Sequence, residues 1–188
     1  MHDRITTFVF GAGASKDAGY PLASSMGQEL VEWMEASEDF RSTATWLKDR
    51  FDNPTDIESV LTEMDDILAR EERSSDSTLI ANVHKPAITQ ALRSWFLQIR
   101  ERQEGSYSSF SSQVVQQGDT VISFNYDDAL ERQLKVSNLW ALGDGYGFPV
   151  EGFGNGFPVT LLKLHGSINW FTALFNGSRG GVFNLFIS

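Results

Sequence analysis

The distribution of apolar and polar positions along the chain predicts three short buried strands. Apolar, β-branched and aromatic residues dominate the runs 5–10, 120–124 and 159–164, and each run ends at glycine or at polar residues. Runs of this length between turn residues are typical of strands in a parallel sheet, which is usually covered on both faces. A further apolar run at 182–187 favours a fourth strand.

A helical period replaces this pattern in most of the remaining chain. Apolar residues recur every three or four positions from Leu22 to Met34, from Ile57 to Leu68 and from Leu79 to Ile99. These stripes predict three helices, and Pro86 should kink or divide the last one, which we extend to about residue 103. Shorter helices are expected at about 107–117 and 127–136, and connections at 37–55, 74–77 and the glycine-rich 143–156.

Strands that alternate with helices indicate an α/β fold with a Rossmann-like parallel sheet. The segment between the first two strands is far longer than one crossover helix needs, and it predicts a large helical insertion over about residues 24–117. The whole chain, residues 1–188, is expected to be one such domain. Because an average sheet has about five or six strands and this chain offers four, we expect the domain to be incomplete at its C-terminus.

Composition excludes several classes of function. The chain has no cysteine, which rules out disulfides, zinc ribbons and thiol nucleophiles. Its formal net charge of −10 would repel phosphate backbones, so we expect no nucleic-acid partner. No run of about 18 apolar residues and no signal-peptide pattern is present, which predicts a cytoplasmic protein with no membrane partner. Histidine and acidic residues form no dense cluster, so no metal is expected.

A glycine turn follows the first strand. The segment Gly11–Ser15, with the sequence Gly-Ala-Gly-Ala-Ser, lets the backbone approach a pyrophosphate closely, and a helix behind it would offer free N–H groups. Lys16 replaces the third glycine of the dinucleotide fingerprint, and no Gly-Lys-Ser/Thr sequence follows. The turn is therefore neither the standard dehydrogenase motif nor a P-loop. A plain glycine turn without a ligand remains the alternative.

Two further motifs follow the second and third strands. Asn125 and Asp127 stand in the sequence Phe-Asn-Tyr-Asp, where Asn125 offers both a donor and an acceptor. His165 stands in Lys-Leu-His-Gly-Ser, where a histidine can act as a general base near neutral pH. The alternatives are that Asp127 only caps the next helix and that His165 is structural. Since ligands of parallel sheets bind beyond the carboxyl ends of strands, we expect the three motifs to converge on one edge.

Taken together, the motifs resemble the signatures of sirtuins. Gly11–Ser15, followed by Gly19-Tyr20-Pro21, resembles the sirtuin pattern Gly-Ala-Gly-x-Ser-x-x-x-Gly-x-Pro at the same spacing. The segments around Asn125 and His165 are similar to the sirtuin Gln-Asn-Ile-Asp and His-Gly motifs. The resemblance spans residues 5–170 and is greatest to the bacterial sirtuin-like branch of antiphage defence systems. In that branch Asn-Tyr-Asp, Leu-His-Gly-Ser and a long helical insertion after the glycine turn are typical.

This resemblance implies a role for each matching residue. Asn125 would be catalytic by holding the nicotinamide ribose and a water, and His165 by acting on a ribose hydroxyl or on that water. Asp127 would contact the nicotinamide amide. The other residues implied to bind NAD⁺ are Gly11, Ala12, Gly13 and Ser15, which would line the diphosphate and ribose, together with Gly166 and Ser167.

Two departures from the sirtuin pattern change the implied reaction. Sirtuin deacylases carry Asp-Phe-Arg after the proline, where this chain has Leu22-Ala23-Ser24, and they usually carry a four-cysteine zinc module that this chain lacks. Both argue against lysine deacylation. We therefore expect an NAD⁺ glycohydrolase that releases nicotinamide and ADP-ribose as an antiphage effector, with NAD⁺ as its substrate.

Two other functions stay open at this point. The same site would serve an NAD-dependent deacylase or an ADP-ribosyltransferase, and a nucleotide sensor or scaffold would bind without turnover. Besides NAD, the partners left open are a second copy of the chain and a fused or separate sensor domain.

Overall fold

The computed structural model describes residues 5–51, 56–69, 75–100, 106–141, 146, 159–168, 170–174 and 182–186. Within them the chain is an α/β protein with a parallel sheet. It divides into a sheet unit, Met1–Tyr20 with Gln103–Ser188, and a helical unit, Pro21–Arg102. In the described part of the chain, no helix combines the length and the apolar character that crossing a membrane requires.

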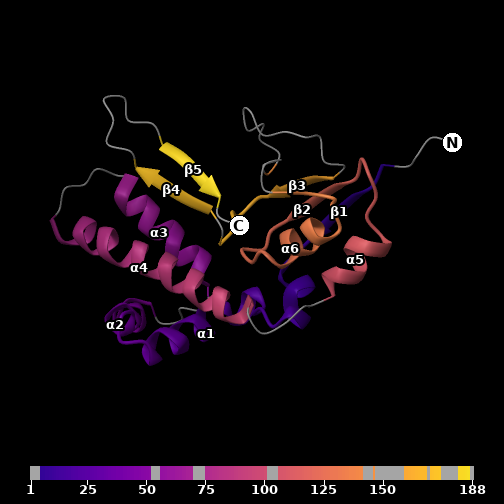
Figure 1. Cartoon of the computed structure of the whole chain (residues 1–188). Helices are drawn as coiled ribbons and strands as arrows, with labels where there is room; N and C mark the ends of the chain where they lie inside the picture. The colour runs from indigo at the N-terminus through magenta and orange to yellow at the C-terminus, as the bar shows by residue number, and fades with distance from the viewer. Residues whose placement is uncertain are drawn as a thin grey trace. The chain divides into compact units, whose positions relative to one another are not determined.

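Three parallel strands form the centre of the sheet unit. β1 (Thr7–Phe10), β2 (Thr120–Ser123) and β3 (Thr160–Lys163) lie in the order β1-β2-β3 (Figure 1). The last residues of the three strands, Phe10, Ser123 and Lys163, are paired in register. The predicted strands are thus confirmed with shorter ends, and the segments that follow them leave the sheet at one edge.

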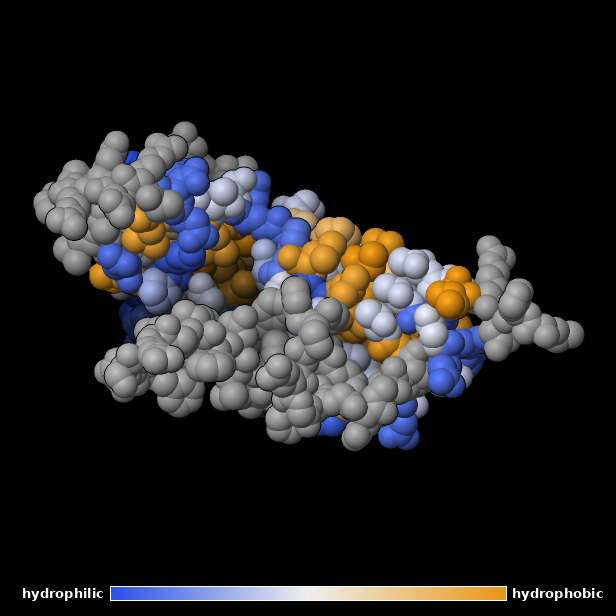
Figure 2. Space-filling view, turned by 90° about the horizontal axis from the view of Figure 1, so that it is seen from above, coloured by the Kyte–Doolittle hydropathy of each residue, from blue (hydrophilic) through white to orange (hydrophobic). Residues whose placement is uncertain are grey.

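Helices cover one face of this sheet. α5 (Tyr107–Gln113) packs on β1 through edge-on ring contacts, with Phe8 and Phe110 at 5.0 Å between centroids and Phe10 and Tyr107 at 5.6 Å. α6 (Ala129–Val136) packs against α5. On the opposite face Val9 is 62% exposed, and apolar side chains are visible at the surface in Figure 2. At β1, therefore, only one face of the sheet is buried.

The C-terminal strand corrects the predicted sheet. β5 (Val182–Phe186) was expected as a fourth strand, but it pairs antiparallel with β4 (Trp170–Leu174) in a separate two-stranded sheet. Only residues 175–181 separate the two strands, and a connection that short permits antiparallel pairing but no parallel crossover. β4 itself was not predicted. Most of the glycine-rich segment 143–156 lies outside the described residues.

The segment after the glycine turn also differs from its prediction. A seven-residue 3₁₀ helix, η1 (Ala12–Ala18), follows Gly11, and Gly19 ends it with a φ of 85°. The expected α-helix, α1 (Ala23–Ala36), begins only after this turn. Because glycine adopts positive φ at no steric cost, Gly19 breaks the helical path before the apolar stripe starts.

Four helices make up the described part of the helical unit. α1 packs against α2 (Arg41–Arg50) and against α4 (Ser75–Arg100), and α3 (Ile57–Ala69) packs against α4. The predicted stripes supply most of its core. Fully or nearly fully buried apolar residues in these helices are Leu30, Met34, Ala44, Leu47, Ile57, Val60, Met64, Ile88 and Ala91.

Two boundaries in this unit were predicted wrongly. α2 lies within 37–55, which was expected to be a connection, because it buries only Thr43, Ala44 and Leu47 and leaves a polar surface elsewhere. α4 begins at Ser75, inside the expected connection 74–77, because polar residues are tolerated in a first helical turn. Pro86 lies inside α4 without dividing it.

A buried carboxylate joins the first two strands of the sheet. Asp119, at 3% exposure, accepts a hydrogen bond from the Thr6 amide at 2.8 Å through Oδ1 and from the Gln116 amide at 2.8 Å through Oδ2. Asp119 therefore closes the turn before β2 and fixes the chain that enters β1. Hydrogen bonds to a charged acceptor are stronger than neutral ones.

We expect Asp119→Ala to lower the free energy of unfolding by about 2–4 kcal/mol, because two buried N–H groups lose their acceptor. Asp119→Asn keeps one acceptor oxygen but turns its NH₂ group toward the other N–H donor, so it should lose a comparable amount. Urea unfolding followed by circular dichroism measures both, with exposed Asp39→Ala as the control. A loss for Asp119→Ala no larger than that of the control would show that these bonds contribute nothing.

Burial disfavours the charged form of His84 in the helical unit. Its Nδ1 lies 3.0 Å from Thr43 Oγ1, and its ring stacks on Trp46 at 4.3 Å between centroids. Burial lowers the pKa of His84 below its ordinary value of 6.5. At mildly acidic pH the unfolded chain therefore binds more protons than the folded chain does.

The free energy of unfolding should accordingly fall as the pH drops through the ordinary histidine range, and it should recover as the pH rises. His84→Phe keeps an aromatic ring on Trp46 and should flatten that part of the profile. Urea unfolding of both proteins between about pH 5 and pH 8 tests this, since that interval brackets the unperturbed histidine pKa. Parallel profiles for wild type and variant would contradict it.

Candidate functional site

The three sequence motifs meet at the carboxyl edge of the parallel sheet. Beyond the strand ends the backbone ladder continues for one more step, with the Phe124 amide donating to the Phe10 carbonyl at 3.0 Å and the Leu164 amide to the Ser123 carbonyl at 3.0 Å. Gly11, Asn125 and His165 each follow directly on one of these ladder positions. The expected convergence of the motifs on one edge is therefore seen in the backbone.

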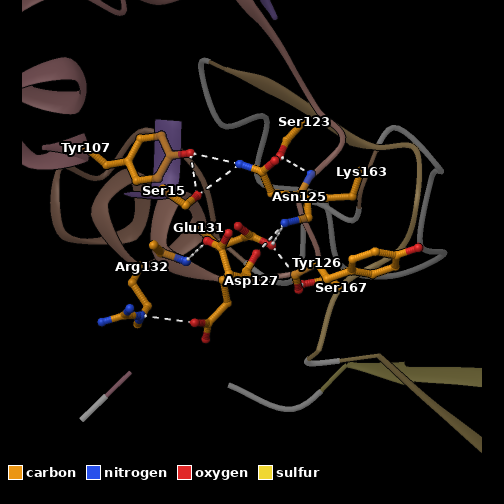
Figure 3. A network of polar contacts seen from close by, with 12 residues as sticks. Ser15, Tyr107, Ser123, Asn125, Tyr126, Asp127, Glu131, Arg132, Lys163 and Ser167 are labelled. Atoms are coloured by element: carbon orange, nitrogen blue, oxygen red, sulfur yellow. Dashed lines mark hydrogen bonds and ion pairs between the residues drawn. The ribbon is translucent and has the colours of Figure 1, made fainter. Parts of the chain in front are cut away.

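The side chain of Asn125 joins the first two motifs. Its Nδ2 donates to the Gly11 carbonyl at 3.1 Å and to Ser15 Oγ at 2.9 Å, and it lies 3.2 Å from the Tyr107 hydroxyl (Figure 3). Its backbone amide donates to Ser123 Oγ at 3.2 Å. One amide group thus connects the ends of β1 and β2 with η1 and α5.

The oxygen of this side-chain amide has no hydrogen-bond partner among the described residues. Asn125 is 6% exposed, and its Oδ1 is buried. A buried acceptor left unpaired costs about 1–3 kcal/mol. A ligand hydroxyl or a water that donates to Oδ1 would remove this cost. Asn125 is therefore arranged to accept a hydrogen bond from a bound group.

The glycines of the first motif leave open space. A Cβ built on Gly11 or on Gly13 meets nothing within 4 Å. Neither glycine has the positive φ that would require it, in contrast to Gly19 and Gly166. Since the folded chain itself has room for a side chain at both positions, their bare backbone is consistent with close approach of a ligand.

A buried ion pair lies at the end of β3. Lys163 Nζ is 3.1 Å from Glu131 Oε1 on α6, and the exposed fractions of the two side chains are 0% and 3%. Ser167 Oγ donates to the same carboxylate at 3.0 Å, and Lys163 also donates to the Asp127 carbonyl (Figure 3). Burial raises the pKa of Glu131, and the charge of Lys163 opposes this shift. These contacts fix the His-Gly turn against the segment after β2.

The acidic residue of the second motif serves the fold. Asp127 Oδ1 accepts from the Ala129 amide at 3.0 Å, at the start of α6, as in the helix-capping alternative. Asp128 pairs with Arg132 at 3.2 Å, one helical turn away. Burial and the negative charges of Asp128 and Asp127 raise the pKa of Tyr20, so this tyrosine stays protonated.

His165 lies at the exposed rim of this edge. Its ring contacts Phe124 edge-on at 5.3 Å between centroids and Tyr126 at 5.9 Å. The turn behind it depends on Gly166, whose φ of 86° is unfavourable for any residue with a side chain. The Ile168 amide then donates to the Tyr126 carbonyl at 2.8 Å. The turn that carries His165 is thus anchored through its backbone, while His165 itself is exposed.

The site contains polar residues that the sequence motifs do not include. Tyr107 contacts both Ser15 and Asn125, and Glu131 pairs with Lys163. Neither Tyr107 nor Glu131 has a local sequence signal, because their partners come from distant segments. By contrast, Gly11 and Ser15 do meet Asn125 directly.

No protein-family model matches the chain, and a search of curated proteins found no match.

We expect Lys163→Met to lower the free energy of unfolding by about 3–5 kcal/mol, because it leaves Glu131 buried without its counter-ion. Adding Glu131→Gln should restore part of this loss, since the remaining group is then neutral. Urea unfolding measures all three proteins.

The exposed ion pair between Lys48 and Glu35, at 2.6 Å, provides the control. Lys48→Met should cost no more than about 1 kcal/mol, because solvent screens that pair. Equal losses for Lys163→Met and Lys48→Met would mean that burial adds nothing to the internal pair.

Proposed function

We propose that this chain binds NAD⁺ at the carboxyl edge of its parallel sheet and hydrolyses the bond between nicotinamide and ribose. The observation that carries this is the Asn125 side chain, whose nitrogen donates to Gly11 and Ser15 while its oxygen is buried and unpaired among the described residues. That is the arrangement needed to accept a hydrogen bond from a ribose hydroxyl or a water. The resemblance to sirtuin motifs supplies the identity of the ligand.

We extend the same proposal to the type of fold. We regard the sheet unit as a Rossmann-like, sirtuin-like nucleotide-binding fold and the helical unit as an insertion after its first strand. In support, the two segments of the sheet unit flank Pro21–Arg102, and the elements described within that range are all helices.

Each residue at the edge has a limited part in the reaction. The oxygen of a water forms a bond to the anomeric carbon of the ribose, and the carbon–nitrogen bond breaks with its electron pair going to nicotinamide. Asn125 orients the ribose or this water through Oδ1. His165 accepts the proton that the water loses, a role worth about 10²–10⁴-fold in rate. Gly11 and Gly13 admit the diphosphate to the backbone.

Asp127 and Ser167 have a smaller part than the motifs suggest. Both side chains are already engaged, Asp127 at the start of α6 and Ser167 on Glu131. We therefore assign them to holding the edge together. The biological role we propose is depletion of cytoplasmic NAD⁺ as an effector of antiphage defence, and it rests on the sequence resemblance alone.

Incubation of the purified chain with NAD⁺ should produce free nicotinamide and ADP-ribose in equal amounts, resolved by chromatography. Asn125→Ala and His165→Ala should each lower kcat/KM by about 10²-fold or more. His84→Phe, in the helical unit, is the matched control for loss of a histidine and should retain the wild-type rate.

Other outcomes would identify the alternatives. ADP-ribose attached to protein would indicate a transferase, and dependence of nicotinamide release on an acylated peptide would indicate a deacylase. Binding of NAD⁺ by calorimetry without turnover would indicate a sensor. Absence of both binding and turnover would contradict the proposal for this chain.

A further inference from the structure

We propose that Tyr107 is a positioning residue that sets the direction of the hydrogen bonds at Ser15. As a result Ser15 presents a donor to the ligand, beside the acceptor that Asn125 presents because the Gly11 carbonyl orients its amide. The identity of the ligand as NAD⁺ rests on the proposed function, whereas the hydrogen-bond directions rest on the geometry of the chain alone.

The orientation of the Asn125 amide follows from the Gly11 carbonyl. That carbonyl lies 3.1 Å from Nδ2 and can only accept a hydrogen bond. With the amide reversed, Oδ1 would face another acceptor and the Gly11 carbonyl would lose its donor from Asn125. Nδ2 therefore faces Gly11, and its second hydrogen goes to the hydroxyl pair of Ser15 at 2.9 Å and Tyr107 at 3.2 Å.

The single hydrogen of the Tyr107 hydroxyl has one acceptor. The hydrogen-bonding neighbours described for this hydroxyl are Asn125 Nδ2 and Ser15 Oγ, the latter at 2.9 Å. An amide nitrogen accepts no hydrogen bond, so Tyr107 donates to Ser15. Burial raises the pKa of Tyr107 above its usual value, which keeps this hydrogen in place throughout the working pH range.

The hydroxyl hydrogen of Ser15 then has no acceptor within this cluster of three side chains. Ser15 Oγ receives hydrogens from Tyr107 and Asn125, so its own O–H is directed to neither. Donation from Ser15 to Tyr107 is disfavoured because a phenol hydroxyl is more acidic and a better donor than an aliphatic hydroxyl, which is the better acceptor. Ser15 is thus a donor beside the Asn125 acceptor. A phosphoribosyl group has the matching pair, a phosphate oxygen that accepts and a sugar hydroxyl that donates.

Tyr107 is well held for this role. It is 3% exposed, it opens α5, and its ring packs edge-on against Phe10 at the end of β1. The hydroxyl reaches the motif residues from a segment about ninety positions further along the chain than Ser15. The direction of the hydrogen bonds at Ser15 is therefore set by a residue outside all three motifs.

A double-mutant cycle tests the inference with two readouts, kcat and KM for NAD⁺ and the Kd of ADP-ribose by calorimetry. Tyr107→Phe and Ser15→Ala should each raise KM and Kd by roughly three- to tenfold with kcat nearly unchanged, because each removes one hydrogen bond made in both the bound and the reacting state. The double variant should be no weaker than Ser15→Ala, because Tyr107 acts through Ser15.

Additive losses in the cycle would overturn the inference, as would a fall in kcat with no change in KM. Tyr146→Phe removes another buried tyrosine hydroxyl, at 1% exposure, and serves as the control for general destabilisation. Its KM and Kd should match those of the wild type.

A second measurement needs no ligand, so it separates this inference from the proposed function. By proton NMR the Tyr107 hydroxyl proton should exchange slowly with water in the wild type, and Ser15→Ala should abolish its protection. If NAD⁺ and ADP-ribose do not bind but this result holds, the proposed function fails and the positioning role of Tyr107 stands. Protection that survives Ser15→Ala would show that Tyr107 donates elsewhere, and the inference would fail.

Discussion

The candidate site depends on one constraint, which is that the buried amide of Asn125 must donate both of its hydrogens. Gly11 and Ser15 lie more than a hundred positions before Asn125 in sequence, and Tyr107 belongs to a separate helix, yet all of them accept from or border the same nitrogen. Removing any acceptor would leave a buried N–H unpaired. The ends of β1 and β2 and the helix α5 are therefore held in one arrangement by the requirement to satisfy a single polar group.

The covered face of the sheet shows how a polar site and an apolar core share three short strands. One cross-strand row consists of Phe8, Val121 and Leu161, and the next row on the same face, two positions toward the carboxyl edge, consists of Phe10, Ser123 and Lys163. Side chains two positions apart on a strand point to the same face. On β2 and β3, therefore, the apolar core is followed by buried polar groups only two residues further along the strand. Ser123 receives the Asn125 backbone amide, and Lys163 forms the internal ion pair. Polar groups buried at these positions are costly to leave unpaired, and each of these two has found a partner.

The sequence patterns predicted those parts of the fold that depend on local chemistry. The three parallel strands follow from apolar runs, and their shared edge follows from parallel topology. The helix α2 was missed because Thr43 and Ala44 contribute to its core without looking apolar in a stripe. The antiparallel pairing of β5 depends on β4, whose run Trp-Phe-Thr-Ala-Leu is rich in β-forming residues but was not predicted as a strand. Tyr107 was missed because its importance comes from long-range contacts.

The motif residues also differ in whether their side chains are already hydrogen-bonded within the fold. Asp127 was expected either to bind a ligand or to cap a helix, and its contact with the Ala129 amide is the capping one. Ser167 is likewise turned toward Glu131. Each side-chain oxygen that serves the fold is less available to a ligand, whereas Asn125 Oδ1 has no such partner among the described residues and His165 is exposed. The function we propose therefore relies on Asn125 and His165, with Ser15 as the neighbouring donor, and it assigns the remaining motif positions to holding the geometry of the edge.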